Sequence, residues 1–341
     1  MHIDSNRVTN PASLTVKQLL KACEERKKLI VQFSDPRACT PANLRVLNEA
    51  CSTVGARLQV RFYGHYQSAF DAALLRSLPE VRDLAVDCLS AIENASAIYD
   101  LTMLEAFSFG VFNFDQPDFL DRIKTDHLRQ LTLTANRKRN FDLSSLARAR
   151  NLRVLYINGH WKNIEAIGDL SDLEAFQLSA FAKAHSLNFI RTISGLRKLT
   201  LILGGRPDID DLASATLETL EIIRVRGLVN LGDLSRFPNL TALKVEDQLQ
   251  IVRLNLQEAS LERLWLTNCK NLASLDGLEL QTRLREFRAS GVALEMDTLL
   301  DRDWPATMRS VKLFKNSRKW NDPAAAKLAK RGLDHPEQLW I

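Results

Sequence analysis

The sequence has few aromatic side chains and no long apolar run. Aromatic residues make up 7% of its 341 residues, whereas hydrophobic residues make up 45%. We therefore expect an interior built chiefly from aliphatic side chains, which suits stacked thin layers better than a core nucleated by aromatic clusters. No stretch approaches the roughly 18 apolar residues of a membrane-spanning helix, and the first residues lack a signal-peptide pattern. The sequence thus predicts a soluble, cytoplasmic protein with no membrane partner, although secretion without a cleavable signal would leave the same pattern.

The residue spacings that bind metals or perform catalysis are also missing. The five cysteines form no Cys-x-x-Cys pair and have no histidine at ligand spacing, so we expect neither a disulfide framework nor a zinc site. The six histidines lie outside any H-E-x-x-H, G-x-S-x-G or glycine-rich phosphate motif. The acidic run at residues 208–211 does not continue as a calcium loop and is interpreted as a turn. We expect no cofactor, no metal ion and no small-molecule substrate.

Charges of both signs are mixed along the chain and form no long block of one sign. The 46 basic and 41 acidic residues leave a formal net charge of +5. Nucleic-acid binding draws most of its affinity from cations that no acidic neighbour compensates. The mixture therefore favours a protein over a nucleic acid as the partner.

An apolar triplet of the form Φ-x-x-Φ-x-Φ, where Φ is an apolar residue, recurs down most of the chain. Successive triplets begin 21 to 24 residues apart. The eleven first positions are Val81, Leu104, Leu128, Leu152, Leu173, Leu196, Leu217, Leu240, Leu261, Leu284 and Met308. Because side chains alternate along a strand, each triplet predicts a short strand with apolar residues inward, and the regular spacing predicts a stack of such strands.

This pattern resembles the leucine-rich-repeat family, whose consensus adds an Asn or Cys eight residues after the first Leu. The sequence supplies Asn136, Cys269 and Asn316 at that offset, while most other turns hold different residues. Apolar residues three apart, as between residues 228 and 240, are typical of 3₁₀ segments. The short repeats resemble the internalin-type and phosphatase-regulator-type repeats, and the chain as a whole resembles a bacterial member of the family. The resemblance implies an α/β solenoid with a parallel sheet on its concave face, which binds another macromolecule.

Residues 1–77 precede the triplets and are expected to form an N-terminal α/β cap. Their pattern predicts, in order, a helix at residues 16–23, a strand at 29–31, a helix between Thr40 and Gly55, a strand at 58–62 and a helix through Phe70, Leu74 and Leu75. This βαβα-like order predicts a parallel sheet that continues into the repeats. A separately folded functional domain is the alternative interpretation.

The rest of the chain divides into the repeat array and a C-terminal cap. Residues 78–318 are expected to form about eleven repeat turns, and residues 319–341 to cover the last of them. The Asp322-Pro323 pair predicts the start of a short helix that passes through Leu328 and ends at Gly332.

The strand residues that alternate with the triplets are expected to line the concave face. A set near the C-terminal end is rich in Trp and Arg, the side chains most enriched at binding hot spots. The set is Lys244, Arg263, Trp265, Arg288, Lys312 and Phe314. Within it, Trp265 is expected to be an exposed indole. Tyr156, near His160 and Trp161, is a second candidate, for which ordinary loop packing is the alternative.

These observations predict a non-enzymatic protein-binding module of bacterial type, which grips a protein partner on its concave face. An immunity or inhibitor protein and a secreted effector are two forms of this hypothesis, and the residues do not distinguish them. The alternative is an enzyme with its active site in the N-terminal unit. Its polar candidates are Cys39, Asp35, His65 and Glu49, whose spacing matches no catalytic motif.

Overall fold

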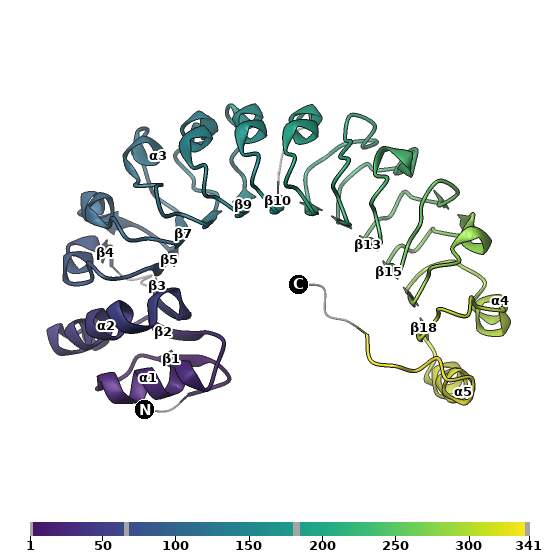
Figure 1. The fold of residues 1–341 in the computed structure, drawn as a ribbon, viewed down its shortest axis with the longest axis horizontal. Helices are drawn as coiled ribbons and strands as arrows, with labels where there is room; N and C mark the ends of the chain where they lie inside the picture. Colours follow the sequence, from purple (N-terminus) through teal and green to yellow (C-terminus); the bar gives the residue numbers. More distant parts are fainter. Residues whose placement is uncertain (1–2, 65–67, 180–184, 338–341) are drawn as a thin grey trace. The chain divides into compact units, whose positions relative to one another are not determined.

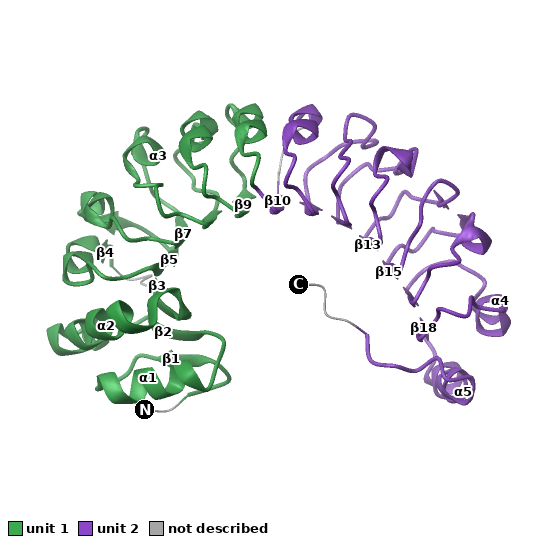
Figure 2. Cartoon of the chain, viewed as in Figure 1, with its two compact units in different colours: residues 1–172 green, residues 173–341 purple. Residues whose placement is uncertain are grey.

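The computed structural model describes residues 3–64, 68–179 and 185–337, and the chain forms two compact units, residues 1–172 and 173–341 (Figure 2). In each unit, parallel strands lie along one side and short helices along the other (Figure 1). This is the α/β arrangement of parallel strands and short convex segments that the triplets predict.

The first unit contains parallel strands in which the triplets are in register. Its strands, in sheet order, are β1 (Arg7–Thr9), β2 (Leu29–Phe33), β3 (Leu58–Tyr63), β5 (Asp83–Leu89), β7 (Ala106–Val111), β8 (Gln130–Leu133) and β9 (Val154–Asn158). A separate short pair consists of β4 (Phe70–Asp71) and β6 (Ile92–Glu93). Phe107 pairs with Leu84 on one side and with Leu131 on the other. The middle residues of successive triplets therefore stack on one another inside the unit.

The helices of the first unit include those predicted near its start. They are α1 (Val16–Glu24), α2 (Pro41–Val54) and α3 (Phe119–Arg122), with 3₁₀ segments η1 (Pro36–Ala38), η2 (Gly55–Arg57), η3 (Ala72–Ser77), η4 (Ala95–Asp100), η5 (Leu143–Arg148) and η6 (Ile164–Asp169). Thr40 caps α2 by accepting a hydrogen bond from the Asn43 N–H, as its place before Pro41 predicts. β3 pairs in parallel with both β2 and β5, which confirms the predicted continuation of the sheet.

The prediction of an α-helix through Phe70 and Leu75 is wrong. Phe70 begins strand β4, and the 3₁₀ segment η3 follows it. The Asp71 side chain accepts a hydrogen bond from the Ala73 N–H and so fixes the tight turn at the start of η3. Ala72, Leu75 and Leu78 are all buried, and this spacing of three fits a 3₁₀ turn better than an α-helix.

An aromatic cluster fills the middle of the first unit, contrary to the aliphatic interior expected from composition. The ring of Phe119 lies 4.3 Å from that of Phe109 and 4.8 Å from that of Phe114, measured between centroids. Phe141 stacks on Phe119 at 5.5 Å. All four rings are at most 3% exposed. The overall aromatic content is low, but these residues fall in neighbouring turns, where their rings meet.

The second unit repeats the same register. Its strands, in sheet order, are β10 (Ala175–Ser179), β11 (Lys198–Ile202), β12 (Thr219–Ile223), β13 (Ala242–Glu246), β15 (Arg263–Thr267), β17 (Glu286–Ser290) and β18 (Ser310–Phe314), and a separate pair is β14 (Arg253–Asn255) with β16 (Ser274–Asp276). Its helical segments are η7 (Asn188–Thr192), η8 (Leu234–Arg236), η9 (Leu278–Leu280), α4 (Met296–Asp301) and α5 (Arg318–Lys330). Leu264 pairs with Leu243 and with Phe287, so the triplets again stack.

The last helix, α5, begins before the predicted Asp322-Pro323 pair. Its first residue is Arg318, and Pro323 lies inside it. The Asn321 side chain accepts from the Lys315 N–H at 2.9 Å and donates to the Lys315 carbonyl at 3.0 Å. These two hydrogen bonds hold the incoming chain against the first turn of α5, so the helix starts earlier than the proline alone suggests.

The turns that leave the strands are held by buried polar side chains. Cys269, at the family's Asn/Cys offset, directs its Sγ to the Thr267 carbonyl at 3.4 Å. His160 and Gln248 occupy the same offset in turns that depart from the consensus. The His160 Nε2 donates to the Thr134 carbonyl at 3.1 Å, and the Gln248 amide donates to the Glu246 carbonyl at 3.0 Å. Cys269 and Gln248 thus bond to a carbonyl of their own strand, whereas His160 bonds to a carbonyl just after the preceding strand.

Gly277 occupies a turn where a side chain has no room. Its φ is +81°, and an added Cβ would lie 2.7 Å from the Gln257 backbone nitrogen. We expect Gly277→Ala to lower the free energy of unfolding by about 2 kcal/mol, because the cost of a left-handed backbone for alanine adds to the cost of the steric overlap with Gln257. Gly332→Ala is the matched control, since Gly332 has a φ of +71° but nothing within 4 Å of an added Cβ. Urea denaturation should show a loss of only about 1 kcal/mol for that control; equal losses would contradict the steric explanation.

Candidate protein-binding face

The open face of the second unit, meaning the strand side chains that point away from the apolar interior, carries the six residues predicted near the C-terminal end. Burial alternates along β15, where Leu264 and Leu266 are buried and Arg263, Trp265 and Thr267 are not. The face is thus the side of the strand opposite the triplet.

Parallel register places four of these residues in one row across neighbouring strands. Lys244 on β13 pairs with Trp265 on β15, Trp265 with Arg288 on β17, and Arg288 with Lys312 on β18. Neighbouring strands lie about 4.8 Å apart, so each side chain in the row reaches the next. Arg263 lies one row away on β15, and Phe314 ends β18. The structure therefore brings the six residues together.

Arg288 is the centre of this face. Its guanidinium carbon lies 5.3 Å from the Trp265 ring centroid and 5.4 Å from the Phe314 ring centroid, within cation–π range. Its Nη1 donates to the Glu337 carboxylate at 3.0 Å. The prediction that Trp265 is an exposed indole is wrong, because the side chain is only partly exposed and Arg288 lies against its ring. Phe314 remains 38% exposed.

Two lysines of the face are paired with carboxylates of the same unit. Lys244 forms an ion pair with Glu246 at 2.8 Å, and Lys198 forms one with Glu221 at 2.9 Å. Glu221 is buried, with 7% of its surface exposed, so this pair is largely shielded from solvent. On this face the mixture of charges seen along the chain thus includes specific ion pairs.

Tyr156 does not belong to this group of strands. It lies on β9 in the first unit, in register with Thr132 of β8. The neighbouring His160 is buried in the turn beyond the strand, whereas Trp161 is 47% exposed. His160 has a clear structural role there, which fits the alternative of loop packing for that residue.

Sequence reasoning missed the segment that follows α5. The Val311 N–H on β18 donates to the Leu333 carbonyl at 2.9 Å, and the His335 N–H donates to the Arg309 carbonyl at 3.2 Å. Ser310 and Asp334 form the antiparallel bridge between these two bonds. The sequence signal was Gly332, which ends the helix, but nothing in the pattern fixes where the chain goes after it.

The described residues of the alternative catalytic set do not form an activated nucleophile. A nucleophilic cysteine needs a lowered pKa, because the thiolate is the reactive form. Burial raises the pKa of the Cys39 thiol to about 12, and the Asp35 carboxylate adds to the shift. Asp35 pairs with Arg37 at 2.7 Å, Glu49 is exposed on α2, and His65 lies outside the described residues.

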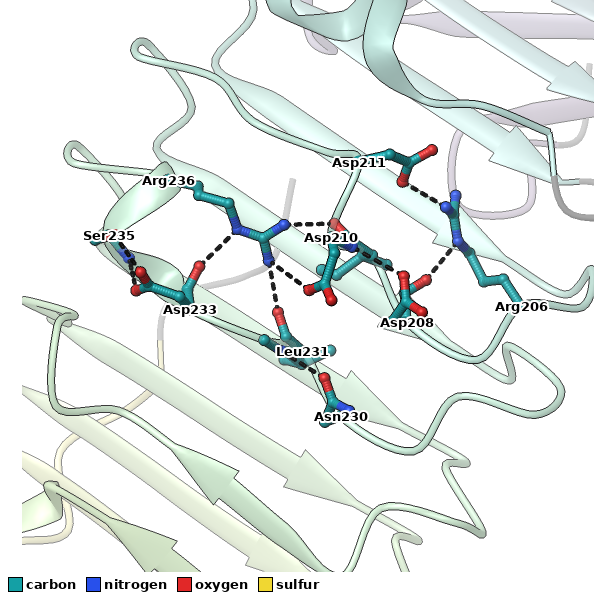
Figure 3. A network of polar contacts seen from close by, with 11 residues as sticks. Arg206, Asp208, Asp210, Asp211, Asn230, Leu231, Asp233, Ser235 and Arg236 are labelled. Atoms are coloured by element: carbon teal, nitrogen blue, oxygen red, sulfur yellow. Dashed lines mark hydrogen bonds and ion pairs between the residues drawn. The ribbon is translucent and has the colours of Figure 1, made fainter.

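The acidic run at residues 208–211 forms a turn held by two arginines (Figure 3). The Arg206 Nε donates to the Asp208 carbonyl at 2.6 Å, and its guanidinium also binds the Asp211 carboxylate. The Arg236 guanidinium lies 3.5 Å from the Asp210 carboxylate. Within residues 3–64, 68–179 and 185–337, no group of three or more His, Cys, Asp or Glu side chains is arranged to hold a metal ion. Asp210 and Asp211 lie in a turn, as the interpretation of the run predicts.

The helices are short throughout the part of the chain that the structure describes. The longest are α2, with 14 residues, and α5, with 13. None of the helices there has the length and apolar character needed to span a bilayer.

Comparison with known proteins identifies the fold. No protein-family model and no curated protein sequence matches the chain. Among solved structures, it is similar to an internalin from Listeria monocytogenes, with 14% identity and a TM-score of 0.53 over 93% of this chain and 89% of that one. It is also similar to a chain of the Drosophila Toll–Spatzle complex, with 14% identity and a TM-score of 0.44 over 91% of this chain and 50% of that one. The leucine-rich-repeat domain of APL1 shows 16% identity and a TM-score of 0.43, over 83% and 86% of the two chains. The internalin likeness and the stacked triplets together show that this chain has the leucine-rich-repeat fold.

Proposed function

We propose that the chain is a non-enzymatic protein-binding module that holds a protein partner on the open face of the second unit. The observation that carries this proposal is the cross-strand row of Lys244, Trp265, Arg288 and Lys312. A parallel sheet holds these side chains at fixed spacing, so they need little further ordering when a partner binds. Trp and Arg at the centre of such a row are the side chains that dominate protein interfaces.

The charge on the face supports a protein partner over a nucleic acid. Lys244 is already paired with Glu246, and Lys198 with Glu221, so phosphates would have to compete with built-in carboxylates. A protein surface can instead match both signs of charge while covering Phe314 and the edge of Trp265.

The proposal leaves two forms open, an inhibitor or immunity protein that covers another protein's active surface, and an effector that acts on a protein after delivery. Both need only a complementary face. The five free cysteines suit a reducing compartment such as the cytoplasm. The identity of the partner decides between the two forms.

We expect the double substitution Trp265→Ala and Arg288→Glu to weaken partner binding at least tenfold, because it removes the central ring and reverses the central charge. The measurement is affinity capture from the native organism followed by mass spectrometry, with tagged wild type and variant compared protein by protein. For each protein that the wild type captures and the variant does not, the affinities of both chains are then measured by titration.

The matched control is Phe112→Ala with Arg226→Glu, since both side chains are exposed and belong to neither candidate site. The control should retain the proteins that the face variant loses, and circular dichroism should show that both variants are folded. If the face variant and the control retain the same proteins with equal affinity, the site lies elsewhere.

A further inference from the structure

We propose that Arg288 is a receptor for a carboxylate of the protein partner, and that the chain's own Glu337 occupies this receptor until the partner displaces it. The proposal rests on the proposed function and deepens it, because it names the partner's chemistry as an extended segment with an acidic side chain. The structure contains an example of such a segment in residues 333–337, seated on the face.

The receptor is built to present a planar cation. Trp265 and Phe314 lie on the strands either side of β17 and flank the guanidinium at 5.3 and 5.4 Å. Rings at these positions restrict the rotamers of Arg288, and its Nη1 donates to a carboxylate, that of Glu337, at 3.0 Å. A guanidinium held in this way loses little freedom on binding a carboxylate, which it can engage with two parallel donors.

The occupant reaches the receptor by adding to the edge of the sheet. Figure 1 shows the chain turning back after α5 toward the strand side of the second unit. Leu333 and His335 pair with the backbone beside Ser310, at the start of β18, through bonds of 2.9 and 3.2 Å. Glu337 then passes beyond this edge strand to Arg288 on the next strand inward. Extended peptides commonly dock on sheets by such edge pairing, in which backbone bonds give affinity and side chains give specificity.

The same row offers further positive charge to an acidic segment. Lys312 is next to Arg288 in register, and its Nζ lies 3.4 Å from the Asp334 carbonyl, so the occupant binds it through a backbone oxygen and not through a carboxylate. A partner segment with a second acidic residue can bind Lys312 directly. This gives the partner an advantage over the internal segment.

The internal contact is suited to displacement. The Arg288 side chain remains 32% exposed and that of Glu337 17%, so the ion pair is only partly shielded from water. Its advantage is the tether, which gives Glu337 a high effective concentration at the receptor. A partner must therefore compete with the tethered Glu337. Its apparent affinity is proportional to the fraction of time that Arg288 is not bound by Glu337.

The test uses full-length chains and a probe of known sequence. The probe is an amidated peptide of residues 332–337, Gly-Leu-Asp-His-Pro-Glu, labelled at its N-terminus, and a second version has Gln in place of the last Glu. We expect Glu337→Gln to raise the affinity of the chain for the Glu peptide about fivefold over wild type in fluorescence anisotropy, because it removes the internal carboxylate from Arg288. Leu333 and His335 keep their backbone bonds beside β18 in both chains, so the comparison isolates the carboxylate. The Gln peptide should bind the same variant about fivefold more weakly than the Glu peptide.

Adding Arg288→Gln to Glu337→Gln should remove the preference for the Glu peptide. Adding Arg283→Gln should leave the preference unchanged, since Arg283 pairs with Glu262 away from the receptor. If Arg288→Gln alters the circular dichroism spectrum, Arg288→Lys replaces it; that variant keeps the charge, loses the planar fork and should reduce the preference to about twofold.

Equal affinity for the two peptides, a preference that survives the loss of Arg288, or no binding to the Glu337→Gln chain would each overturn the carboxylate receptor. These outcomes leave the protein-binding role standing, because no partner takes part in the measurement. Conversely, retention of every captured protein by the Trp265 and Arg288 double variant contradicts the protein-binding role on this face, whatever the peptide does.

Discussion

Phe119→Ala is expected to lower the free energy of unfolding of the first unit by about 4 kcal/mol, the usual cost of truncating a fully buried phenylalanine. Phe119 is 0% exposed, and its ring is in contact with those of Phe109, Phe114 and Phe141. The four-residue helix α3 is too short to be stable alone, so the ring also anchors this helix to the strands. Urea denaturation followed by circular dichroism measures the loss.

Phe112→Ala is the matched control for this prediction. Phe112 lies just beyond β7 in the same turn of the chain, but it is 52% exposed. Its truncation removes the same atoms without opening a cavity, and we expect a change within about 0.5 kcal/mol. If Phe119→Ala and Phe112→Ala have similar effects, the aromatic cluster does not stabilise the unit.

His160 is expected to make the chain less stable in mild acid. Burial lowers the pKa of His160 to about 4, although the hydrogen bond to the Thr134 carbonyl opposes the shift. The Phe141 N–H donates to Nδ1 at 3.1 Å, so protonation of that nitrogen would place two donors face to face. The ring also stacks on Phe141 at 4.4 Å between centroids.

The direction of this effect follows from proton binding. In the unfolded chain the His160 pKa returns to about 6.5, so between pH 6.5 and 4 the unfolded state binds the proton and the folded state does not. The stabilisation is therefore complete above pH 6.5 and is lost as the pH falls toward 4. The pKa shift corresponds to a loss of about 3 kcal/mol in the free energy of unfolding between pH 7 and pH 4.

His160→Asn isolates this contribution. Asparagine is the family residue at this offset and carries a donor and an acceptor, but it does not titrate. Carboxylates with lowered pKa values, such as Asp142 and Asp247, also destabilise the fold in acid, but they are common to both chains. Urea midpoints at pH 7 and pH 4 should therefore fall further in wild type than in His160→Asn. Parallel losses would show that His160 does not carry the pH dependence.

Much of the fold could be predicted because each strand depends on local pattern. The triplet that begins at Leu261 gives β15, with Leu264 and Leu266 inward and Trp265 outward, and the spacing between triplets gives the register with β13 and β17. Helix α2 was predicted from Thr40, Pro41 and Gly55, which act within one turn of its ends. Local patterns fail where the same residues fit more than one kind of element. Phe70 begins a strand and not the predicted helix, and α5 begins before the predicted proline.

The candidate site was only partly predictable, for a related reason. Register follows from the repeat, so the row from Lys244 to Lys312 could be placed from sequence. The position of Glu337 could not, because the segment after Gly332 belongs to no repeat and contacts residues that lie 24 and 49 positions earlier in the chain. The half-buried state of Trp265 has the same cause, since its exposure depends on how Arg288 lies against it.

The sequence alone determined a stack of parallel strands, the residues that face inward and the row of side chains that face outward. It did so because strand geometry alternates with a period of two and the triplets return at a nearly constant spacing. The tertiary structure decided which polar side chains close the turns, where the aromatic rings gather and which residue occupies Arg288. Those outcomes depend on contacts between residues far apart in the chain, whose geometry no local pattern specifies.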